Sequence, residues 1–407
     1  MKCRHCATPL HRQFLDLGHA PPSNAYLSVA DLSAPEVTYP LRVFVCDTCH
    51  LVQTDDFTSE TELFSADYAY FSSTSPSWLA HAEAYATMIT ARLGLDSGSK
   101  VIEIASNDGY LLKNFVRTGI PCLGIEPTDG TADAAEALGV PVLRAFFGEA
   151  TARHLAASGH LADLVCGNNV YAHVPDINDF TRGLAIVLKP DGVITLEFPH
   201  LLRMIEQCQF DTAYHEHFSY LSLSVVCRIF DSAGLRVFDV ERLPTHGGSL
   251  RIYGCHVQSA HPQHVSVAQC LADERDGGLA GTAVYDGFQA RANAVKDALV
   301  AFLIETKRAG RTVAGYGAAA KGNTLMNYAG IRPDLVSFIA DAAASKQGRF
   351  MPGSHIPIFP PQALTDRRPD FVLILPWNLA DEISGQLAPL ARQGTRFVTA
   401  VPELKVR

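Results

Sequence analysis

The sequence lacks both a dense run of basic residues and an apolar stretch of about 18 residues. Its 33 basic residues are outnumbered by 42 acidic ones, which gives a net charge of −9. The chain therefore has no electrostatic footprint for phosphate backbones or anionic lipid surfaces, and no segment that could span a bilayer. We expect neither nucleic acid nor a membrane as a partner.

The first ten residues, MKCRHCATPL, also lack the apolar core of a secretory signal. We therefore expect a cytoplasmic protein, in which ten cysteines indicate metal binding, reactivity or core filling in place of a disulfide scaffold. A chain of 407 residues exceeds what one hydrophobic core usually supports, so two or three domains are expected.

Two C-x-x-C pairs stand near the N-terminus, in KCRHC and VCDTCH. Each pair can hold one metal ion through both thiolates, and two pairs together close a tetrahedral zinc site with no open position. The predicted ligands of a structural zinc ion are Cys3, Cys6, Cys46 and Cys49. The alternatives are four unrelated core cysteines, or His5 or His50 in place of one thiolate. The intervening TYPLRVFVC predicts a strand, so the module should be small and rich in β-structure.

A strand is predicted at 101–104 in GSKVIEIASNDGYLLKNF, followed by a polar, glycine-containing turn and an amphipathic helix. This order of elements exposes helix-end amides to a ligand, but the turn lacks the G-x-G-x-x-G pattern of a dinucleotide site. Glu126 ends a second strand in CLGIEP, where a carboxylate can accept hydrogen bonds from two ribose hydroxyls. A solvated strand-end acid is the alternative. Together the two features are similar to the S-adenosylmethionine site of class I methyltransferases.

The next segments, LADLVCGNNVYAHVPD and LKPDGVITLEFPH, predict two more buried strands, at whose ends functional side chains should gather. Asn168, Asn169 and His173 follow the first strand, although His173 could instead cap a helix or lie on the surface. In FDTAYHEHFSYLS, Tyr214 and His217 can face the same way, being three residues apart, and His217 is the predicted base. A metal site at His215 and His217 is the alternative, disfavoured because such neighbours point in opposite directions on a helix.

Closer to the C-terminus, RTVAGYGAAAKGNTLMNY predicts a strand, a glycine-rich turn and a helix, and LVSFIAD, FVLILPW and RFVTAVPE predict further strands of an α/β domain. Gly315 and Gly317 would let backbone amides approach an anion, and Lys321 would add charge near a diphosphate. A Rossmann-like domain that serves packing alone is the alternative.

In this order, the two CxxC pairs, DYAYFSSTS, EIASNDGYLL, GIEP, NNVYAHVPD, YHEHFSYLS, THGGSLR and GYGAAAKGNTLMNY resemble the motifs of the bacterial sugar C-methyltransferases, which methylate ring carbons of nucleotide-linked keto-deoxysugars. The resemblance covers essentially the whole chain. One departure is Tyr171, where a smaller aliphatic residue would be expected.

The resemblance implies an α/β protein with a small, β-rich zinc-binding domain at 1–65, a class I (Rossmann-like) methyltransferase domain at 66–240, and a Rossmann-like α/β domain at 241–407 that shares in binding the nucleotide sugar. The implied activity is S-adenosylmethionine-dependent methylation of a ring carbon next to the ketone of a keto-deoxysugar, which we expect to be linked to dTDP. The implied catalytic residues are Tyr68, His173, Tyr214, Glu216 and His217. The expected cofactor-binding residues are Glu103, Ala105, Asn107, Gly109, Glu126 and Asn168. The expected substrate-binding residues are Tyr70, Asn169, Ser249, Arg251, Lys321 and Asn323, although Arg251 could equally close an ion pair.

Methylation at carbon needs a base that removes the proton next to a ketone, donors that stabilise the enolate, and a fixed sulfonium. His217 fits the base because the pKa of imidazole lies near the working pH. Tyr68, Tyr70, Tyr214 or His173 could donate to the oxyanion, and Glu216 could orient an imidazole or contact the sugar. An O- or N-methyltransferase on a related sugar nucleotide, and a zinc-ribbon binding protein with an inactive methyltransferase fold, are the alternatives. The sequence does not identify the sugar, the nucleotide, the methylated carbon, its stereochemistry or the oligomeric state.

Overall fold

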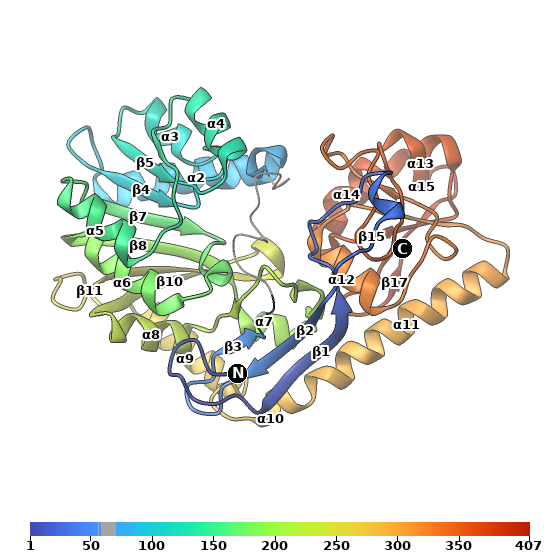
Figure 1. Ribbon diagram of the computed structural model, residues 1–407, viewed down its shortest axis with the longest axis horizontal. Coiled ribbons are helices and arrows are strands. Elements are labelled where there is room, and N and C mark those ends of the chain that lie inside the picture. Colours follow the sequence, from blue (N-terminus) through green and yellow to red (C-terminus); the bar gives the residue numbers. More distant parts are fainter. Residues whose placement is uncertain (56, 58–70) are drawn as a thin grey trace.

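Three β-sheets organise the chain in the computed structural model, which describes residues 1–55, 57 and 71–407 (Figure 1). The helices that pack on them are α2 (Pro76–Leu93), α3 (Leu112–Arg117), α4 (Asp129–Ala137), α5 (Glu149–Ala157), α6 (Ile177–Val187), α7 (Leu201–Glu206), α8 (Leu223–Ser232), α9 (Val265–Asp276), α10 (Ala283–Asp286), α11 (Phe288–Arg308), α12 (Ala320–Tyr328), α13 (Gln362–Arg367), α14 (Ala380–Gln386) and α15 (Ala388–Ala391). Within the described residues, no helix is long and apolar enough to cross a membrane.

The N-terminal sheet has four antiparallel strands in the order β1 (Arg12–Ala20), β2 (Tyr39–Val45), β3 (Val52–Thr54) and β9 (Ser219–Tyr220). In β2 the buried residues Leu41, Val43 and Val45 alternate with more exposed ones, as expected for a sheet with one face in the core. The fourth strand comes from far along the chain: Val52 pairs with Tyr220 and Gln53 with Ser219. The sheet thus includes the end of the YHEHFSY segment.

The middle sheet has seven strands in the order β10-β11-β8-β7-β4-β5-β6. Their bounds are β4 (Val101–Ile104), β5 (Cys122–Ile125), β6 (Val142–Leu143), β7 (Ala162–Asn168), β8 (Leu188–Pro199), β10 (Leu235–Leu243) and β11 (Ser249–His256). β4 to β8 are parallel, and β11 and β10 add an antiparallel edge. Because the strand order reverses between β4 and β7, their carboxyl ends form the topological switch point of the sheet.

Both faces of the middle sheet are covered by helices, as its nearly continuous apolar strands require. One core contains residues of α2, α3 and α4 with Val101, Cys122 and Leu164 of the sheet. The other contains residues of α5, α6, α8 and α9 with Ile102 and Val165, the neighbours that point to the opposite face. The predicted α/β class with a Rossmann-like middle sheet is confirmed.

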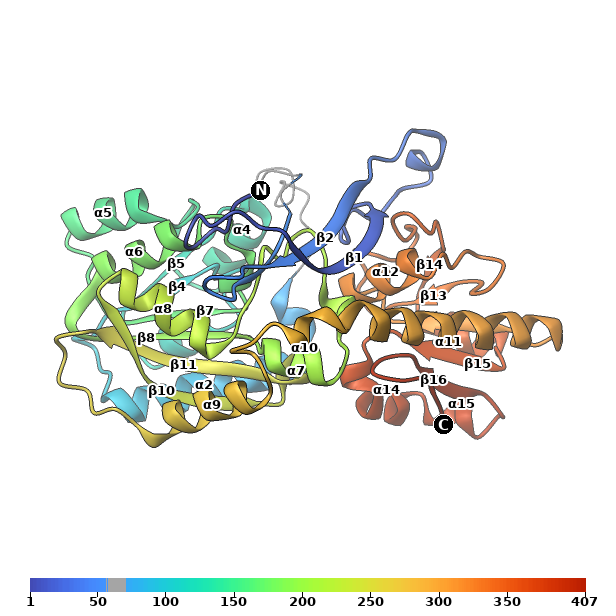
Figure 2. The same cartoon turned by 90° about the horizontal axis from the view of Figure 1, so that it is seen from below.

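The C-terminal sheet has six strands in the order β14-β13-β12-β15-β16-β17, with only the last pair antiparallel. The bounds are β12 (Val313–Tyr316), β13 (Ile339–Ala340), β14 (Ile358–Phe359), β15 (Phe371–Ile374), β16 (Arg396–Thr399) and β17 (Lys405–Val406). Figures 1 and 2 show the long β1 and β2 strands between this sheet and the middle sheet. The contact is specific: the Tyr26 hydroxyl donates to the Ala318 carbonyl at 2.5 Å, and Leu27 forms a β-bridge with Phe350.

The division of the chain at 240/241 stays a prediction, but it falls inside β10. The β10–β11 hairpin, which runs to His256, pairs along β8 from Ser249↔Pro199 to Gly254↔Ile194. This hairpin, with the motif THGGSLR at its turn, therefore belongs to the middle sheet and carries its turn toward the C-terminal domain.

Candidate functional site

The first part of the site is the turn after β4. Ala105, Asn107 and Gly109 have φ angles of 56°, 49° and 75°, in the left-handed region that residues with a side chain rarely adopt. Glycine is needed at 109 because an added Cβ would lie 3.1 Å from the Cβ of Ala135. The turn therefore exposes its backbone at the switch point of the sheet, where ligands bind in α/β folds.

Buried polar atoms mark this edge of the sheet as a ligand site. Among the described residues, the carboxylate of Glu103 and the side-chain amide of Asn168 form no hydrogen bond of good geometry, although both interact with the Tyr110 hydroxyl. Burial raises the pKa of Glu103 well above its ordinary value. Leaving such groups unpaired costs about 1–3 kcal/mol each, so a ligand that bonds to them is favoured. The donors and acceptors at the ends of β4 and β7 thus fit the polar groups of S-adenosylmethionine.

Glu126, at the tip of β5, connects two loops of this site. Its Oε2 accepts from the backbone N–H of Asn107 at 3.0 Å, and its Oε1 accepts from the backbone N–H of Thr128 at 3.0 Å. Oε1 also accepts from the Thr128 hydroxyl at 2.5 Å. A carboxylate has about four acceptor positions, so one is left for a ribose hydroxyl, and a second ribose bond would have to replace that of the Thr128 hydroxyl.

The segment before α2 covers the same turn. The backbone N–H groups of Ser72 and Ser73 donate to the side chains of Asn107 and Asp108 at 2.9 and 3.0 Å. Tyr68 and Tyr70, which the sequence assigns to catalysis and substrate binding, lie outside the described residues.

The second part of the site is the loop at 213–218, which contains the motif YHEH. His217 is buried, and its Nδ1 lies 2.8 Å from the carbonyl oxygen of Thr212. Because a carbonyl can only accept, Nδ1 carries the proton and Nε2 keeps its lone pair. The His217 ring lies 3.9 Å from that of Tyr214 and 4.6 Å from that of His173, measured between ring centroids. The structure thus brings these three predicted catalytic residues together.

The electrostatics of this cluster keep its imidazoles neutral. Burial lowers the pKa of His217 well below its usual value, and repulsion from His173, His246 and Lys321 lowers it further. Burial also lowers the pKa of His173 to about 4, although a hydrogen bond to the backbone of Glu216 opposes the shift. A neutral imidazole with a free Nε2 can accept a proton.

The two remaining residues of the motif point elsewhere. The Oε1 atom of Glu216 accepts from Nδ2 of Asn24 at 2.7 Å, and Nε2 of His215 lies 3.3 Å from the carbonyl oxygen of Pro40. His215 is therefore directed to the N-terminal domain and not to His217. The described residues contain no metal-ligating group that includes this pair.

All three domains hold the loop. Thr54 of β3 donates from its hydroxyl to the His217 carbonyl at 3.1 Å, and its N–H donates to the Phe218 carbonyl at 3.1 Å. From the C-terminal domain, the Thr324 hydroxyl of α12 donates to the Ala213 carbonyl at 2.9 Å. The position of His217 therefore depends on contacts from both flanking domains.

The third part of the site lies where α12 meets the turn at Phe210–Thr212. Asp211 is fully buried, and its Oδ2 accepts from Nε1 of Trp377 at 2.7 Å. Nζ of Lys321 donates to Oδ1 of Asn378 at 2.7 Å and lies 4.7 Å from the centroid of a Trp377 ring. Burial raises the pKa of Asp211 to about 6, and Lys321 opposes the shift. Asn323 is also fully buried, with no partner for its amide among the described residues.

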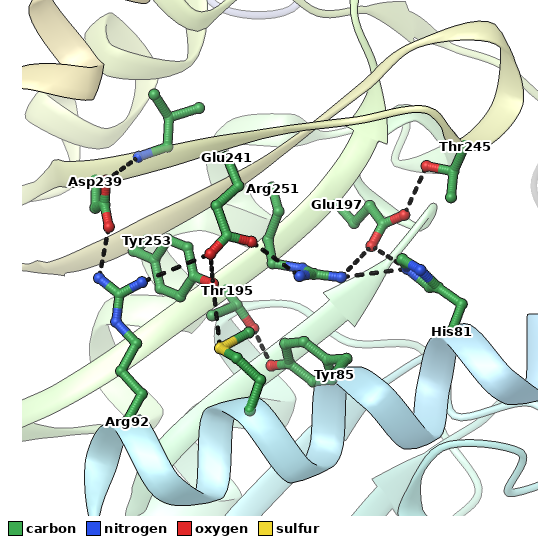
Figure 3. Close-up of polar contacts among 12 residues, drawn as sticks. His81, Tyr85, Arg92, Thr195, Glu197, Asp239, Glu241, Thr245, Arg251 and Tyr253 are labelled. Carbon is green, nitrogen blue, oxygen red and sulfur yellow. Dashed lines mark hydrogen bonds and ion pairs between the residues drawn. The ribbon is translucent and has the colours of Figure 1, made fainter.

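Two predicted substrate residues are instead engaged within the protein. The buried Arg251 guanidinium forms ion pairs with Glu197 at 3.1 Å and Glu241 at 3.0 Å, in the network drawn in Figure 3. The sequence left open whether Arg251 binds the nucleotide sugar or closes an ion pair, and the structure gives it the ion pair. The Ser249 hydroxyl donates to the Thr245 carbonyl at 2.9 Å and is likewise buried.

Tyr171, the departure from the family pattern, belongs to the core. Its hydroxyl lies 2.7 Å from that of Thr181, and its ring packs among Phe180, Phe198 and Phe230. Asn169, two residues earlier, has its Nδ2 3.1 Å from Nε2 of His246, and its role in substrate binding stays a prediction. Sequence reasoning missed His246 and Asp211, although both lie in motifs that it singled out. No pattern along the chain shows that those segments meet.

The four predicted zinc ligands come together at the N-terminus. The sulfur atoms of Cys3, Cys6, Cys46 and Cys49 all lie within 4.8 Å of one another, and the closest pairs are 3.5 Å apart. Four thiolates at about 2.3 Å from one tetrahedral zinc ion would show sulfur separations of this size. The cysteine cluster therefore fits a structural zinc ion.

Comparison with known proteins identifies the family. The family model of a C-methyltransferase C-terminal domain matches residues 244–402, that of a zinc binding domain matches 3–64, and that of a methyltransferase domain matches 78–240. The C-methyltransferase NovU of Streptomyces niveus is 35% identical over 408 aligned residues, which cover 100% of this chain and 96% of NovU. The chain belongs to this family of bacterial C-methyltransferases, and its cofactors are S-adenosylmethionine and zinc.

Other similarities are limited to part of the chain. A ubiquinone biosynthesis O-methyltransferase of Rhizobium etli is 34% identical over 101 residues, 24% of this chain and 40% of that protein. Among solved structures, the magnesium protoporphyrin IX methyltransferase of Synechocystis, with bound SAH, aligns with a TM-score of 0.35 and 13% identity over 44% of this chain and 83% of that one.

Removal of zinc should disturb the loop at 213–218, called the histidine loop below, before it disturbs the cofactor site. The cysteine cluster closes the turn between β2 and β3, and β3 holds the loop through Thr54. Chelation, or the change Cys46→Ser, should therefore lower the melting temperature and the methyl-transfer rate while the dissociation constant for S-adenosylhomocysteine stays near its original value. Elemental analysis that finds no zinc in folded, active protein would contradict the assignment.

Loss of the Glu126 carboxylate should weaken cofactor binding. We expect Glu126→Ala to raise the dissociation constant about 10–100-fold, because hydrogen bonds to a charged group contribute roughly 1.5–3 kcal/mol. Glu126→Gln keeps one acceptor oxygen and should lose less affinity. Calorimetry that gives the same dissociation constant for all three proteins would remove Glu126 from the site.

Proposed function

We propose that this C-methyltransferase methylates the ring carbon next to the ketone of a nucleotide-linked keto-deoxysugar, with dTDP as the nucleotide and His217 as the base. The proposal rests on the family resemblance of the motifs and on the environment of His217. An α-hydrogen of a ketone is acidic enough for a side-chain base once the enolate is stabilised.

The observation that carries the proposal is the hydrogen bond from Nδ1 of His217 to the Thr212 carbonyl. It fixes the tautomer in which Nε2 can take the α-proton, and it orients the ring. Burial, with a contribution from Lys321, holds the pKa of His217 down, so the imidazole is neutral before the reaction. The proton leaves carbon with its bonding electrons remaining on the substrate as an enolate, and His217 becomes an imidazolium.

One group next to His217 is suited to stabilise the enolate oxygen. Tyr214 lies against the His217 ring and can donate from its hydroxyl. His173 is neutral and its one N–H bonds to the backbone of Glu216, so in this proposal it packs beside the base and does not donate to the enolate. Tyr68 remains a predicted donor. Glu216, whose side chain bonds to Asn24, orients the loop in this proposal.

S-adenosylmethionine, when bound, supplies an electrophilic methyl group. Glu126 would hold the ribose, Glu103 and the turn at 105–109 the amino acid portion, and Asn168 the adenosine side. These residues lie at the ends of the parallel strands β4, β5 and β7, the edge of the sheet where Asn169 and His173 follow β7.

The nucleotide would lie toward the C-terminal domain. Lys321 supplies a positive charge at the start of α12, and the unpartnered amide of Asn323 offers both a donor and an acceptor. We propose these two residues as contacts of the diphosphate and the sugar. Incubation with a panel of nucleotide-linked 4-keto deoxysugars and labelled methyl donor tests the substrate class, and proton NMR separates a C-methyl from an O-methyl or N-methyl product.

Exchange of the α-hydrogen tests the base. Because proton removal precedes methylation, the wild-type protein without a methyl donor should exchange this hydrogen with deuterated water. His217→Asn should lose exchange and methyl transfer together, by roughly 10²–10⁴-fold. Tyr214→Phe, which keeps the base, should slow both rates by a smaller factor. Exchange at the wild-type rate in His217→Asn would move the base elsewhere, with His173 as the next candidate.

In the pH profile of the exchange rate, the midpoint of the acid limb should lie below the ordinary pKa of imidazole, about 6.5. A group whose pKa is lowered stays unprotonated as the pH falls through 6.5, so the base remains competent there. Lys321→Gln removes one of the charges that lower the pKa of His217, and should shift the limb to higher pH at saturating substrate. A limb at or above pH 6.5 in the wild-type protein would contradict the buried environment of the base.

A further inference from the structure

The turn between β10 and β11 holds a histidine in an unusual backbone conformation. His246 has φ 54° and ψ 21°, in the left-handed region, and precedes two glycines. The glycines fit tight surroundings: a Cβ on Gly247 would lie 2.4 Å from the Trp377 ring, and one on Gly248 would lie 2.7 Å from the Arg203 side chain. A strained backbone conformation like that of His246 persists only where the surrounding structure enforces it, and such conformations concentrate at functional sites.

Buried polar contacts anchor the turn on the middle sheet. The Thr245 hydroxyl donates to Oε1 of Glu197 at 3.0 Å, while Oε2 of Glu197 pairs with His81 of α2 at 2.9 Å and with Arg251 of β11 at 3.1 Å (Figure 3). On the opposite side, Nε2 of Gln209 donates to the Gly247 carbonyl at 2.8 Å. The residues on both sides of His246 are therefore held in place.

The His246 ring has one nitrogen engaged and one available. Its Nε2 lies 3.1 Å from Nδ2 of Asn169, and the Trp78 ring packs edge-on against it, with the centroids 5.4 Å apart. Since an amide nitrogen only donates, Nε2 accepts and the proton resides on Nδ1. Within the described part of the chain, Nδ1 has no hydrogen-bond partner.

His246 lies among the groups of the proposed reaction. Burial lowers its pKa to about 4, and repulsion from Lys321 and His81 adds to the shift while Glu197 opposes it. Its charge would in turn lower the pKa of His173 and of His217. His246 is therefore neutral and offers an N–H, and its contact with Asn169 places it at the end of β7, which His173 also follows.

The geometry points to His246 as a third imidazole of the active site, one that donates a hydrogen bond from Nδ1 to an oxygen of the substrate's sugar. This inference rests on the proposed function. Being neutral, His246 binds the substrate without adding a positive charge next to His217. Asn169 and Thr245 act as positioning residues, since the first fixes the tautomer and the second fixes the turn.

Two substitutions at 246 separate the hydrogen bond from the backbone conformation. Both Asn and Gly tolerate a left-handed φ, but only Asn keeps an N–H near the position of Nδ1. The probe is dTDP-4-keto-6-deoxyglucose, whose binding is measured by calorimetry with S-adenosylhomocysteine present and whose α-hydrogen exchange is measured by NMR. We expect His246→Gly to weaken probe binding about 10-fold, with unchanged affinity for S-adenosylhomocysteine, and His246→Asn to restore most of the loss.

A matched pair of substitutions tests the positioning role of Thr245. Thr245→Val removes the hydroxyl that bonds to Glu197 and should weaken probe binding less than His246→Gly does, whereas Thr245→Ser should restore wild-type binding. Equal probe affinity in wild-type and His246→Gly protein would overturn the inference, and so would a His246→Asn protein as weak as His246→Gly.

The same measurements separate this inference from the proposed function. Probe that binds to the wild-type protein without α-hydrogen exchange would contradict the proposed chemistry and leave the contact with His246 to be decided by the binding data. A wild-type protein that does not bind the probe would overturn both.

Discussion

The pairing of β3 with β9 is the constraint on which the site depends. Two residues of β9 extend a sheet that begins some 200 positions earlier, and they directly follow the histidine loop. Thr54 adds hydrogen bonds to the carbonyl groups of His217 and Phe218, so the loop is attached to β3 at consecutive residues. The cysteine cluster stands at the turn before β3. A zinc ion held by these cysteines would thus support the loop through a short length of backbone.

A second constraint is that the buried imidazoles of the site stay uncharged. His173, His217 and His246 lie within each other's electric fields, and burial lowers the pKa of each. Three imidazoles can lie close together in this site because all of them stay neutral. Each of them also has a hydrogen-bond partner on its ring or its backbone. The permanent charges are placed around them: Lys321 and Asp211 on the side of the C-terminal domain, and the Glu197 network beneath the β10–β11 turn. In the proposed reaction, proton transfer to His217 would create a single new positive charge, next to the enolate that forms with it.

The parts of the fold that depend on local spacing were predictable from the sequence. Two C-x-x-C pairs place four thiolates, and a strand followed by a polar turn places Glu103 next to the switch point of the middle sheet. What could not be predicted depends on contacts between distant segments. The spacing in YHEH suggested that Tyr214 and His217 face the same way, and their rings do lie together, but the segment is an irregular loop whose shape comes from Thr54, Asn24 and Thr324. Arg251 has the chemistry of a phosphate ligand, and only the register of β10 against β11, which sets Glu241 opposite it, shows that the guanidinium is already paired.

The central claim is that Nε2 of His217 faces the α-carbon of a bound keto sugar. A crystal structure of the protein with zinc, S-adenosylhomocysteine and a nucleotide-linked 4-keto deoxysugar tests it most directly. The account predicts Nδ1 of His217 still bonded to the Thr212 carbonyl, and Nε2 about 3–3.5 Å from the carbon next to the ketone, as reacting atoms require. A sugar bound with its ketone away from the histidine loop, or with another side chain next to that carbon, would contradict it.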